Sequence, residues 1–496
     1  MLLKELLVGR TLPVQAAELA IRGLTADSRE VEPGYLFAAL PGSKLDGSAF
    51  IADAVGKGAV AVLADEATKA DARVPIVRDA NPRRTLALAA ARFYPRQPER
   101  VVAVTGTNGK TSVTVFARQI WAALGERAAS LGTLGVLGAD GARLDDGPPL
   151  TTPDPVRLHA MLDRLAGDGF TRLALEASSH GLDQFRLDGV RVRAAAFTNL
   201  TRDHLDYHGT ESAYAAAKRR LFTELLSADG TAVINVDGEH GAEFATAAER
   251  AHRKVWRIGR MGREIKLLEA RPSARGQLIH LDTFGERTAI ELPLIGAFQT
   301  SNALLAAGLV IACGADAARA IAMLIKLQGV PGRMQLVGDV LCEGGTAHVY
   351  VDYAHTPDAL RTVLTAIRPH AVGKLHVVFG CGGDRDKGKR PLMGAAATEF
   401  ADTLIVTDDN PRSESAAGIR REILQGIPPG RAREIGDRAE AIGAAIGGLA
   451  AGDILMIAGK GHETGQIVGT VTHPFDDADV ARACIAAHNK AGGHHG

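Results

Sequence analysis

The chain has 496 residues, which is enough for about three domains at roughly 100–200 residues each. Its 57 basic and 57 acidic side chains balance, which argues against a protein that attracts nucleic acid or an anionic membrane surface. Hydrophobic residues make up 46% of the chain, so the sequence supplies apolar surface for several buried cores.

The N-terminal segment does not resemble a targeting signal. Lys4, Glu5 and Arg10 interrupt its short apolar stretch, and no small-residue cleavage site follows. No uncharged run reaches the roughly 20 residues that span a bilayer. The four cysteines are scattered without CxxC pairs, as is typical of reduced cytosolic thiols. We therefore expect a cytoplasmic protein, and a monomer because no feature of a dimer is visible.

Short runs of Val, Ile and Leu alternate along the chain with longer segments rich in Ala, Leu and Arg. This alternation is typical of βαβ units, so we predict an α/β fold with mostly parallel sheets. Proline breaks predict three domains, residues 1–96, 97–332 and 333–496. In chain order, the expected strands are Ala59–Leu63, Val101–Val104, Leu173–Leu175, Ala194–Phe197, Val349–Val351, His376–Phe379, Leu404–Val406 and Ile454–Ile457.

The clearest local signal is the heptapeptide TGTNGKT, Thr105–Thr111, which lies between an apolar strand and a helix expected to run to Leu124. Such a turn directs backbone N–H groups and a helix N-terminus at phosphate oxygens. Lys110 would reach the β- and γ-phosphates, and the Thr111 hydroxyl would bind Mg²⁺. The spacing departs from GxxxxGK[ST], because Val104 stands where the first Gly belongs. An ordinary Gly-containing turn is the alternative, but strand, glycines, Lys-Thr pair and helix all occur in register.

Polar side chains follow the next two strands. Glu176 ends the run Leu173–Leu175, and a loop rich in Asp and His follows Ala194–Phe197. Ligands of open α/β sheets collect at the carboxyl ends of strands, so these positions favour a metal-assisted phosphoryl site. A capped loop entering a helix explains each single residue of the second loop about as well. Those residues are Asn199, Asp203, His204, Asp206 and His208.

A helix is expected over Tyr214–Phe222, and it carries Lys218, Arg219 and Arg220 in a row. By themselves these three residues indicate no more than a solvated basic face. A phosphate loop alone also does not distinguish a ligase from a kinase, a motor or a switch protein.

The segments TGTNGKT, EASSHGL, NLTRDHLDYHG, AYAAAKRRLF, GAFQTSN and VDYAHTPDAL occur in the order seen in the Mur ligase family. The resemblance covers nearly the whole chain, and it is greatest to the members that add the third residue of the peptidoglycan stem peptide. It implies an N-terminal domain for the UDP end of the substrate, a central ATP-binding domain and a Rossmann-like C-terminal domain for the incoming amino acid. It also implies a role in cell-wall synthesis, and hence in cell shape and division.

The resemblance further implies the residues that bind ATP and two Mg²⁺ ions. The implied ATP-binding residues are Thr105, Gly106, Thr107, Asn108, Gly109, Lys110, Thr111, Asn302, Arg333 and Asp352. The implied metal ligands are Thr111, Glu176, His204 and Lys218, the last as a carbamate. A carbamylated lysine is chemically sensible because an ammonium would repel Mg²⁺, whereas a carbamate supplies oxygen ligands. Lys110, Glu176, His204 and Lys218 are the implied catalytic residues.

The nucleotide-sugar peptide substrate is expected to lie along a third set. The implied contacts are Ser28, Ser43, Lys44 and Leu45 at its UDP end, and Thr151, Thr152, Ser178, Gln184 and Arg186 at its peptide end. Leu150 departs from the family pattern, in which a polar Asn is expected before the Thr pair.

Three polar loops in the last block concern the amino acid. GDRD, DNPR and GKGHE each follow an apolar run, and parallel strands would bring their ends to one edge of a sheet. DNPR resembles the motif of family members that use meso-diaminopimelate, and relatives that use L-lysine carry a different motif. Arg412 could bind the additional distal carboxylate bidentately, and Glu463 could accept from the distal ammonium. The expected contacts are Arg385, Asp409, Asn410, Pro411, Arg412, Gly459 and Glu463.

These implications favour a ligase that joins meso-diaminopimelate to UDP-MurNAc-L-Ala-D-Glu through an acyl phosphate. The alternatives are an L-lysine-adding or folylpolyglutamate-forming member of the superfamily and, outside ligases, a regulatory P-loop ATPase. A nucleotide-binding module without catalysis is a further alternative, against which Lys110, Thr111 and Glu176 argue. No residue stands out as the base that deprotonates the amine.

Overall fold

The computed structural model describes residues 1–13, 15–42, 46–69, 72–145, 150–201 and 203–492. Ser43, Lys44 and Leu45, which we expect at the UDP end of the substrate, lie outside the described residues. The chain forms two compact units, the first of Met1–Lys266 with Ala303–Met323 and the second of Leu267–Asn302 with Leu324–Gly496.

Strands and helices alternate through the first unit. Its elements are α1 (Leu3–Leu6), β1 (Gly23–Thr25), β2 (Tyr35–Ala39), α2 (Ile51–Gly56), β3 (Ala61–Asp65), β4 (Ile76–Asp79), α3 (Pro82–Phe93), β5 (Arg100–Thr105), α4 (Lys110–Ala123), β6 (Ala128–Gly132), β7 (Gly135–Leu137), α5 (Pro155–Gly167), β8 (Arg172–Glu176), α6 (Ser179–Asp183), β9 (Val192–Phe197), α7 (Leu205–His208), α8 (Glu211–Arg220), β10 (Leu226–Asn235), α9 (Gly241–Arg250), β11 (Lys254–Gly259) and α11 (Ala317–Ala322). Two further elements belong to both units, β12 (Ile265–Ser273) and α10 (Ala297–Ala312).

The first four strands form a parallel sheet in the order β1-β2-β3-β4. Alternate residues of a strand point to opposite faces. Leu36 and Ala38 therefore lie in one core with residues of α3, whereas Phe37 and Ala39 lie in another with residues of α2. Burial of both faces is what a parallel sheet requires.

The next sheet carries the phosphate loop. Its strands within the first unit follow the order β11-β10-β9-β5-β8-β6-β7, and only the β6–β7 pair among them is antiparallel. Helices α5, α8 and α9 contribute Leu158, Tyr214 and Phe244 to one core on this sheet. β5 lies between β9 and β8, so the loop that follows β5 has a strand end on either side.

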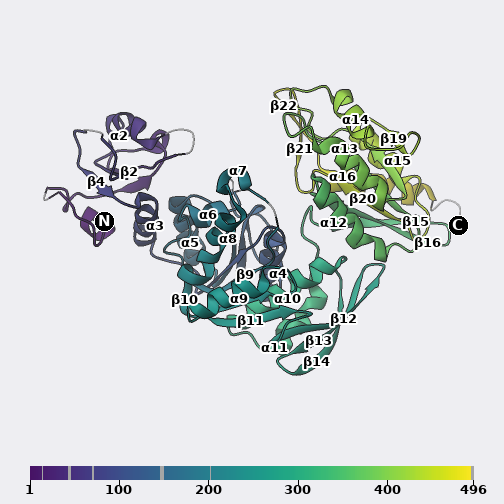
Figure 1. Cartoon of the computed structure of the whole chain (residues 1–496), viewed down its shortest axis with the longest axis horizontal. Coiled ribbons are helices and arrows are strands. Elements are labelled where there is room, and N and C mark those ends of the chain that lie inside the picture. The colour runs from purple at the N-terminus through teal and green to yellow at the C-terminus, as the bar shows by residue number, and fades with distance from the viewer. Residues whose placement is uncertain (14, 43–45, 70–71, 146–149, 202, 493–496) are drawn as a thin grey trace. The chain divides into compact units, whose positions relative to one another are not determined.

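The second unit contains another mostly parallel sheet. Its elements are β13 (Gly276–Thr283), β14 (Glu286–Leu292), β15 (Gln335–Cys342), β16 (Gly345–Asp352), α12 (Pro357–Ile367), β17 (Leu375–Phe379), α13 (Lys389–Phe400), β18 (Thr403–Val406), α14 (Ala416–Leu424), β19 (Ala432–Glu434), α15 (Arg438–Ile446), β20 (Ile454–Ala458), β21 (Gly465–Val468), β22 (Val471–Pro474) and α16 (Asp477–Gly492). The strand order is β15-β16-β20-β17-β18-β19. Figure 1 labels β15, β16, β19 and β20 of this sheet.

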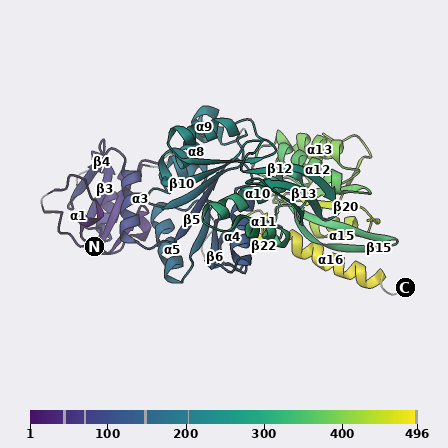
Figure 2. The same cartoon turned by 90° about the horizontal axis from the view of Figure 1, so that it is seen from below.

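Helices cover both faces of this sheet, and Figure 2 shows α12 and α13 above β20 with α15 and α16 below it. Alternation along the strands explains the two cores. Phe379 packs with residues of α12 and α13, and its neighbour Val378 packs with residues of α15 and α16. The α/β class with mostly parallel sheets, predicted from the sequence, is confirmed.

One predicted helix differs in its ends. α8 begins at Glu211, and its α-helical hydrogen bonding stops at Arg220, where a π-helical turn (Leu221–Leu225) takes over. Among the helices of the described residues, none is both long and apolar enough to cross a membrane.

Candidate active site

The loop Thr105–Thr111 links the central strand β5 to α4. Two of its positions require glycine. Gly106 has φ of 146°, and a Cβ added there would lie 1.9 Å from Thr198 Oγ1. Gly109 has φ of 86° and forms the N-cap of α4, so it starts the helix from a left-handed conformation. These glycines let the loop turn tightly, so that α4 begins directly after it with Thr111 in the first turn.

The end of the neighbouring strand β9 holds this loop in place. Thr198 Oγ1 donates to the Asn108 carbonyl at 2.6 Å, and Asn199 Oδ1 accepts from the Asn108 amide at 3.0 Å. The Asn199 carbonyl accepts from the Thr107 amide at 2.9 Å. Asn199 thus holds the loop Thr105–Thr111 in place. Thr198 was missed by sequence reasoning, although its place at a strand end was the available signal.

Two lysines converge on one carbonyl of the loop. Lys110 Nζ donates to the Gly106 carbonyl at 2.9 Å and to the Thr107 carbonyl at 2.8 Å. Lys218 Nζ, from α8, donates to the same Gly106 carbonyl at 2.8 Å and lies over the Tyr214 ring. Burial, and then the proximity of Lys110, hold the pKa of Lys218 well below its usual range. Lys218 is therefore a neutral amine over a pH range in which exposed lysines are charged.

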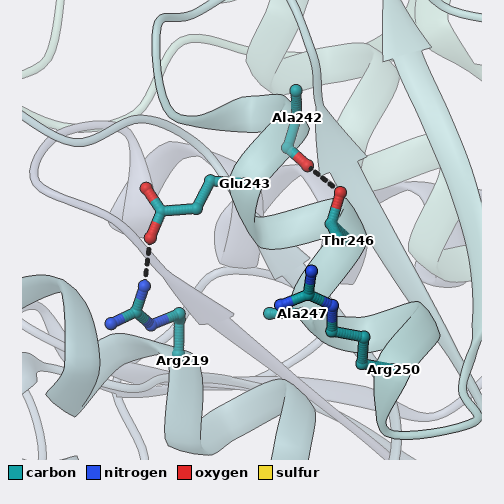
Figure 3. A pocket seen from close by; sticks show the side chains of 6 residues that line it. All are labelled: Arg219, Ala242, Glu243, Thr246, Ala247 and Arg250. Carbon is teal, nitrogen blue, oxygen red and sulfur yellow. Dashed lines mark hydrogen bonds and ion pairs between the residues drawn. The ribbon is translucent and has the colours of Figure 1, made fainter.

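The basic run on α8 divides in three directions. Lys218 is 1% exposed and faces the loop, whereas Arg219 forms an ion pair with Glu243 of α9 at a surface hollow (Figure 3). Arg220 pairs with the buried Asp188 at 3.1 Å. Only one of the three residues thus reaches the candidate site, which sequence composition could not reveal.

Glu176 stands at the end of β8, in register with Val104 of β5. Its side chain is buried, and its two carboxylate oxygens accept from the Thr133 amide at 2.9 Å and the Thr133 hydroxyl at 3.2 Å. The Thr133 hydroxyl also lies 3.0 Å from that of Thr151. Thr133 was not among the predicted residues, and no sequence signal distinguished it. It joins the predicted metal ligand Glu176 to the predicted substrate contact Thr151.

The other predicted peptide-end contacts belong to the same network. Thr152 Oγ1 donates to the Glu176 carbonyl at 2.8 Å and accepts from the Ser178 amide at 3.0 Å. Arg186 donates to the Thr152 carbonyl and to Gln184 Oε1, each at 2.7 Å. The structure thus brings all five residues predicted at the peptide end together at the carboxyl end of β8.

Two further positions bear on the substrate: Ser28 lies away from the peptide-end network, and Leu150 replaces the expected Asn. Ser28 begins a 3₁₀ turn (Ser28–Glu30) after β1, and its carbonyl accepts from Lys57 Nζ at 3.0 Å. Leu150, the departure from the family pattern, is 45% exposed beside Thr151 and offers no polar atom on its side chain.

His204 lies in a cluster of rings. It precedes α7 with φ of 51°, and its ring centroid is 4.9 Å from that of His180. The His180 ring also contacts those of Tyr207 and His208. Burial lowers the pKa of His180, and the neighbouring His204 and His208 lower it further. The cluster lies where α7 and α6 meet α8 (Figure 1), the helix that carries Lys218.

In the second unit, two of the residues predicted to bind ATP, Asn302 and Arg333, are joined through Gln299. Asn302 Nδ2 donates to Gln299 Oε1 at 3.0 Å, and Gln299 Nε2 donates to the Arg333 carbonyl at 3.4 Å. The Arg333 guanidinium lies over the Tyr353 ring. Burial raises the pKa of Asp352, and both Arg333 and the two backbone amides that donate to its carboxylate oppose this shift.

The three loops at the end of this sheet converge. Phe379 is paired both with Val406 and with Ala458, so β17, β18 and β20 end at the same level. The Gly383 amide donates to the Asn410 carbonyl at 2.9 Å, which joins the first loop to the second. The expectation that parallel strands bring GDRD, DNPR and GKGHE to one edge is confirmed.

The charged residues of these loops differ in how they are held. Arg412 has φ of 51°, and its Nη1 donates to the Gly383 carbonyl at 2.9 Å. Glu463 Oε2 accepts from Asn410 Nδ2 at 2.8 Å. Arg385 is exposed, and Asp409 is buried next to Gly459, where an added Cβ would lie 2.7 Å from Asp409 Oδ2. A cation, Arg412, and an anion, Glu463, thus lie in loops at one edge of the sheet.

The fold and the loop after β5 define an α/β protein of the P-loop type. Three family models match the chain: the "Mur ligase family, catalytic domain" over residues 20–94, the "Mur ligase middle domain" over 104–310 and the "Mur ligase, glutamate ligase domain" over 332–461. The chain belongs to the Mur ligase family.

Similar proteins include two named "UDP-N-acetylmuramoyl-L-alanyl-D-glutamate--2,6-diaminopimelate ligase". The one from Caulobacter vibrioides is 54% identical over 93% of this chain and 95% of its own. The one from Brucella melitensis is 52% identical over 98% of this chain and 99% of its own. A solved structure of a ligase with the same name covers 100% of both chains at 36% identity, with a TM-score of 0.75. A folylpolyglutamate synthase from Mycobacterium tuberculosis, 20% identical with a TM-score of 0.61, shares the fold.

Proposed function

We propose that this chain is an ATP-dependent ligase that adds meso-diaminopimelate to UDP-MurNAc-L-Ala-D-Glu in peptidoglycan precursor synthesis. The observation that carries the proposal is the near full-length identity to relatives that bear this activity in their names. The proposal includes the domain boundaries 1–96, 97–332 and 333–496, a cytoplasmic location and a monomeric state.

We assign the phosphates of ATP to the loop Thr105–Thr111. Lys110 supplies the positive charge, and its hydrogen bonds to two loop carbonyls show that its ammonium already lies against the backbone that would cradle the phosphates. Asn302, Arg333 and Asp352 are assigned to the nucleoside and the phosphate end of ATP. The link from Asn302 through Gln299 to the Arg333 carbonyl, and the bond from the Met334 amide to Asp352, support this grouping.

The side chains around the loop suit Mg²⁺ only if Lys218 is carbamylated. Glu176 offers a buried carboxylate at the strand end beside the loop, and Thr111 offers a hydroxyl in the first turn of α4. An ammonium beside Lys110 would repel a cation, and a neutral amine nitrogen is a poor ligand for Mg²⁺, whereas a carbamate on Lys218 would supply oxygen ligands. We therefore assign Mg²⁺ to Thr111, Glu176, His204 and carbamylated Lys218, with two ions expected. The metal would neutralise charge that develops on the transferred phosphoryl group.

The reaction has two steps. The side-chain carboxylate of the D-glutamyl residue attacks the γ-phosphorus of ATP, the bond to the β–γ bridging oxygen breaks, and an acyl phosphate and ADP form. Lys110 stabilises the charge that builds on the phosphoryl oxygens. The neutral amine of meso-diaminopimelate then attacks the activated carbonyl carbon, inorganic phosphate leaves, and the amine loses its proton as the amide forms. The network of Thr151, Thr152 and Arg186 is assigned to holding the peptide during the first step.

Phosphate release tests the proposal directly. Purified protein would be given ATP, Mg²⁺ and UDP-MurNAc-L-Ala-D-Glu, with meso-diaminopimelate or L-lysine added in parallel. We expect release that depends on the dipeptide substrate and on meso-diaminopimelate. Release with L-lysine alone would keep the ligase and contradict the amino-acid assignment. Release that is indifferent to both substrates would contradict the ligase itself and favour a regulatory ATPase.

Selection of meso-diaminopimelate is assigned to Arg412. Replacing it with Lys keeps a charge but removes the planar fork that binds a carboxylate bidentately. We expect kcat/KM for meso-diaminopimelate to fall by about 10²-fold, while kcat/KM for L-lysine changes by less than about threefold. Arg421→Lys, at an exposed position on α14, is the matched control. An equal loss with both amino acids would show that Arg412 does not read the distal carboxylate.

A further inference from the structure

A buried lysine lies inside the loop that carries Glu463. The side chain of Lys460 has an exposed fraction of 0%, and its Nζ donates to Asn410 Oδ1 at 3.0 Å. Glu463 Oε2 lies 3.4 Å from the same nitrogen. A buried ammonium is costly unless anions and acceptors surround it, so its position indicates a specific structural task. Lys460 has no role in the reaction assigned above.

The amide of Asn410 transmits the position of Lys460 to Glu463. Its Oδ1 accepts from Lys460 Nζ and from the Ile467 amide, both at 3.0 Å. Two donors on one side determine which end of the amide is oxygen, so Nδ2 must face the other way. There it donates to Glu463 Oε2 at 2.8 Å. The Glu463 side chain nevertheless remains 36% exposed, so its carboxylate is held by the protein and still accessible.

Other contacts hold the backbone of the DNPR loop without Lys460. Gln466 Nε2 donates to the Asp409 carbonyl at 2.7 Å, and the Arg412 amide donates to the Ile467 carbonyl at 3.0 Å. The Gly383 amide donates to the Asn410 carbonyl. Loss of the Lys460 ammonium is therefore expected to release the Asn410 amide and the Glu463 carboxylate while the path of the loop persists.

We propose that Lys460 is a positioning residue for amino-acid selection, which fixes the Glu463 carboxylate through the Asn410 amide and by its own charge. The inference rests on the proposed function and on the expectation from the sequence that Glu463 accepts a hydrogen bond from the distal ammonium of meso-diaminopimelate. Lys460 and Arg412 then act on two different groups of the amino acid. Lys460 positions the carboxylate that binds the distal ammonium, and Arg412 binds the distal carboxylate.

Two analogues of meso-diaminopimelate separate these tasks. L-lysine lacks the distal carboxylate, and 2-aminopimelate lacks the distal amine. The full-length protein and its Lys460→Met variant would be assayed for phosphate release with each of the three compounds, with inhibition constants for any that is not turned over. Lys374→Met, at an exposed position of the same unit, is the matched control.

We expect Lys460→Met to reduce the preference for meso-diaminopimelate over 2-aminopimelate by about tenfold, because one charge-assisted contact is lost. The preference over L-lysine, and the KM for ATP, should change by less than about twofold, since the carboxylate end is intact. Arg412→Lys should show the reverse pattern. Lys460→Gln, which keeps a donor near Asn410 without the charge, should lie between wild type and Lys460→Met and provides a second variant should the first not fold.

An unchanged preference over 2-aminopimelate in folded Lys460→Met and Lys460→Gln would overturn the inference. An equal fall in both preferences, or a rise in the KM for ATP, would also overturn it, because it would show a general loss of loop structure. Failure of the wild type to release phosphate with the dipeptide and meso-diaminopimelate would instead overturn the proposed function, and the inference with it. Wild-type activity with unaltered selectivity in the variants overturns the inference alone.

Discussion

Lys110→Met is expected to reduce kcat for phosphate release by about 10³-fold, a loss typical of removing a group that stabilises transition-state charge. Lys110 is the residue of the loop whose ammonium lies against the Gly106 and Thr107 carbonyls, where the proposed phosphates would be cradled. Met retains much of the length and apolar volume of the side chain and removes its charge. The loss should therefore appear in kcat, because the charge of the phosphoryl group changes most between ground state and transition state.

The measurement is steady-state phosphate release at saturating dipeptide and amino acid, together with thermal unfolding. Lys266→Met, at an exposed position of β12 in the first unit, controls for the loss of one lysine and should keep wild-type kcat. The folded Lys110→Met variant should unfold within a few degrees of wild type. A kcat within about tenfold of wild type would show that Lys110 does not contact the transferred phosphate.

Lys218→Ala is expected to reduce kcat for phosphate release by about 10³-fold, as for Lys110→Met. Millimolar acetate or formate should restore part of the lost rate. The proposed carbamate supplies carboxylate-like oxygens, and a small carboxylate can occupy the space that the shortened side chain leaves. Lys218→Arg keeps a cation at the same position and should remain inactive with and without acetate. Acetate should not stimulate the wild type.

The state of Lys218 also predicts a pH dependence. Carbon dioxide reacts with the neutral amine, and burial has lowered the pKa of Lys218, so the neutral form prevails at pH values above this lowered pKa. As the pH falls towards the lowered pKa, the amine gains its proton, and both the carbamate and the activity should decline. With ¹³C-labelled bicarbonate, a carbamate carbonyl signal should be visible by NMR in the wild type and missing in Lys218→Ala. A wild-type protein that is fully active without this signal would contradict the assignment.

The local pattern of the chain was sufficient for the fold class and for the position of the main loops. Apolar runs such as Val101–Val104 are continuous because strands of a parallel sheet are buried on both faces. Such a run can be recognised in the sequence without knowledge of the strands with which it pairs. The loop after β5 could also be predicted from the sequence, since Gly106 and Gly109 adopt conformations that other residues rarely reach. Convergence of the three loops in the second unit followed from parallel topology alone, in which all strand ends meet at one edge.

The partners of individual polar side chains, by contrast, could not be predicted from the sequence. Lys218, Arg219 and Arg220 are consecutive and chemically alike, yet only Lys218 faces the phosphate loop, because α8 packs that side against the sheet. Which side a helix buries depends on elements far away in the chain, and a short polar run carries no record of them.

Asn410 shows the same distinction at the amino-acid site. The DNPR motif predicted it as a substrate contact, and in the structure its Oδ1 accepts from Lys460 and Ile467 while its Nδ2 donates to Glu463. The partners lie 50 to 57 positions further along the chain. Lys460 and Glu463 follow β20, and Ile467 lies in β21. A motif records which residue types a site needs, but hydrogen bonds form between groups that folding brings within about 3 Å, so only the packed chain assigns each donor to its acceptor.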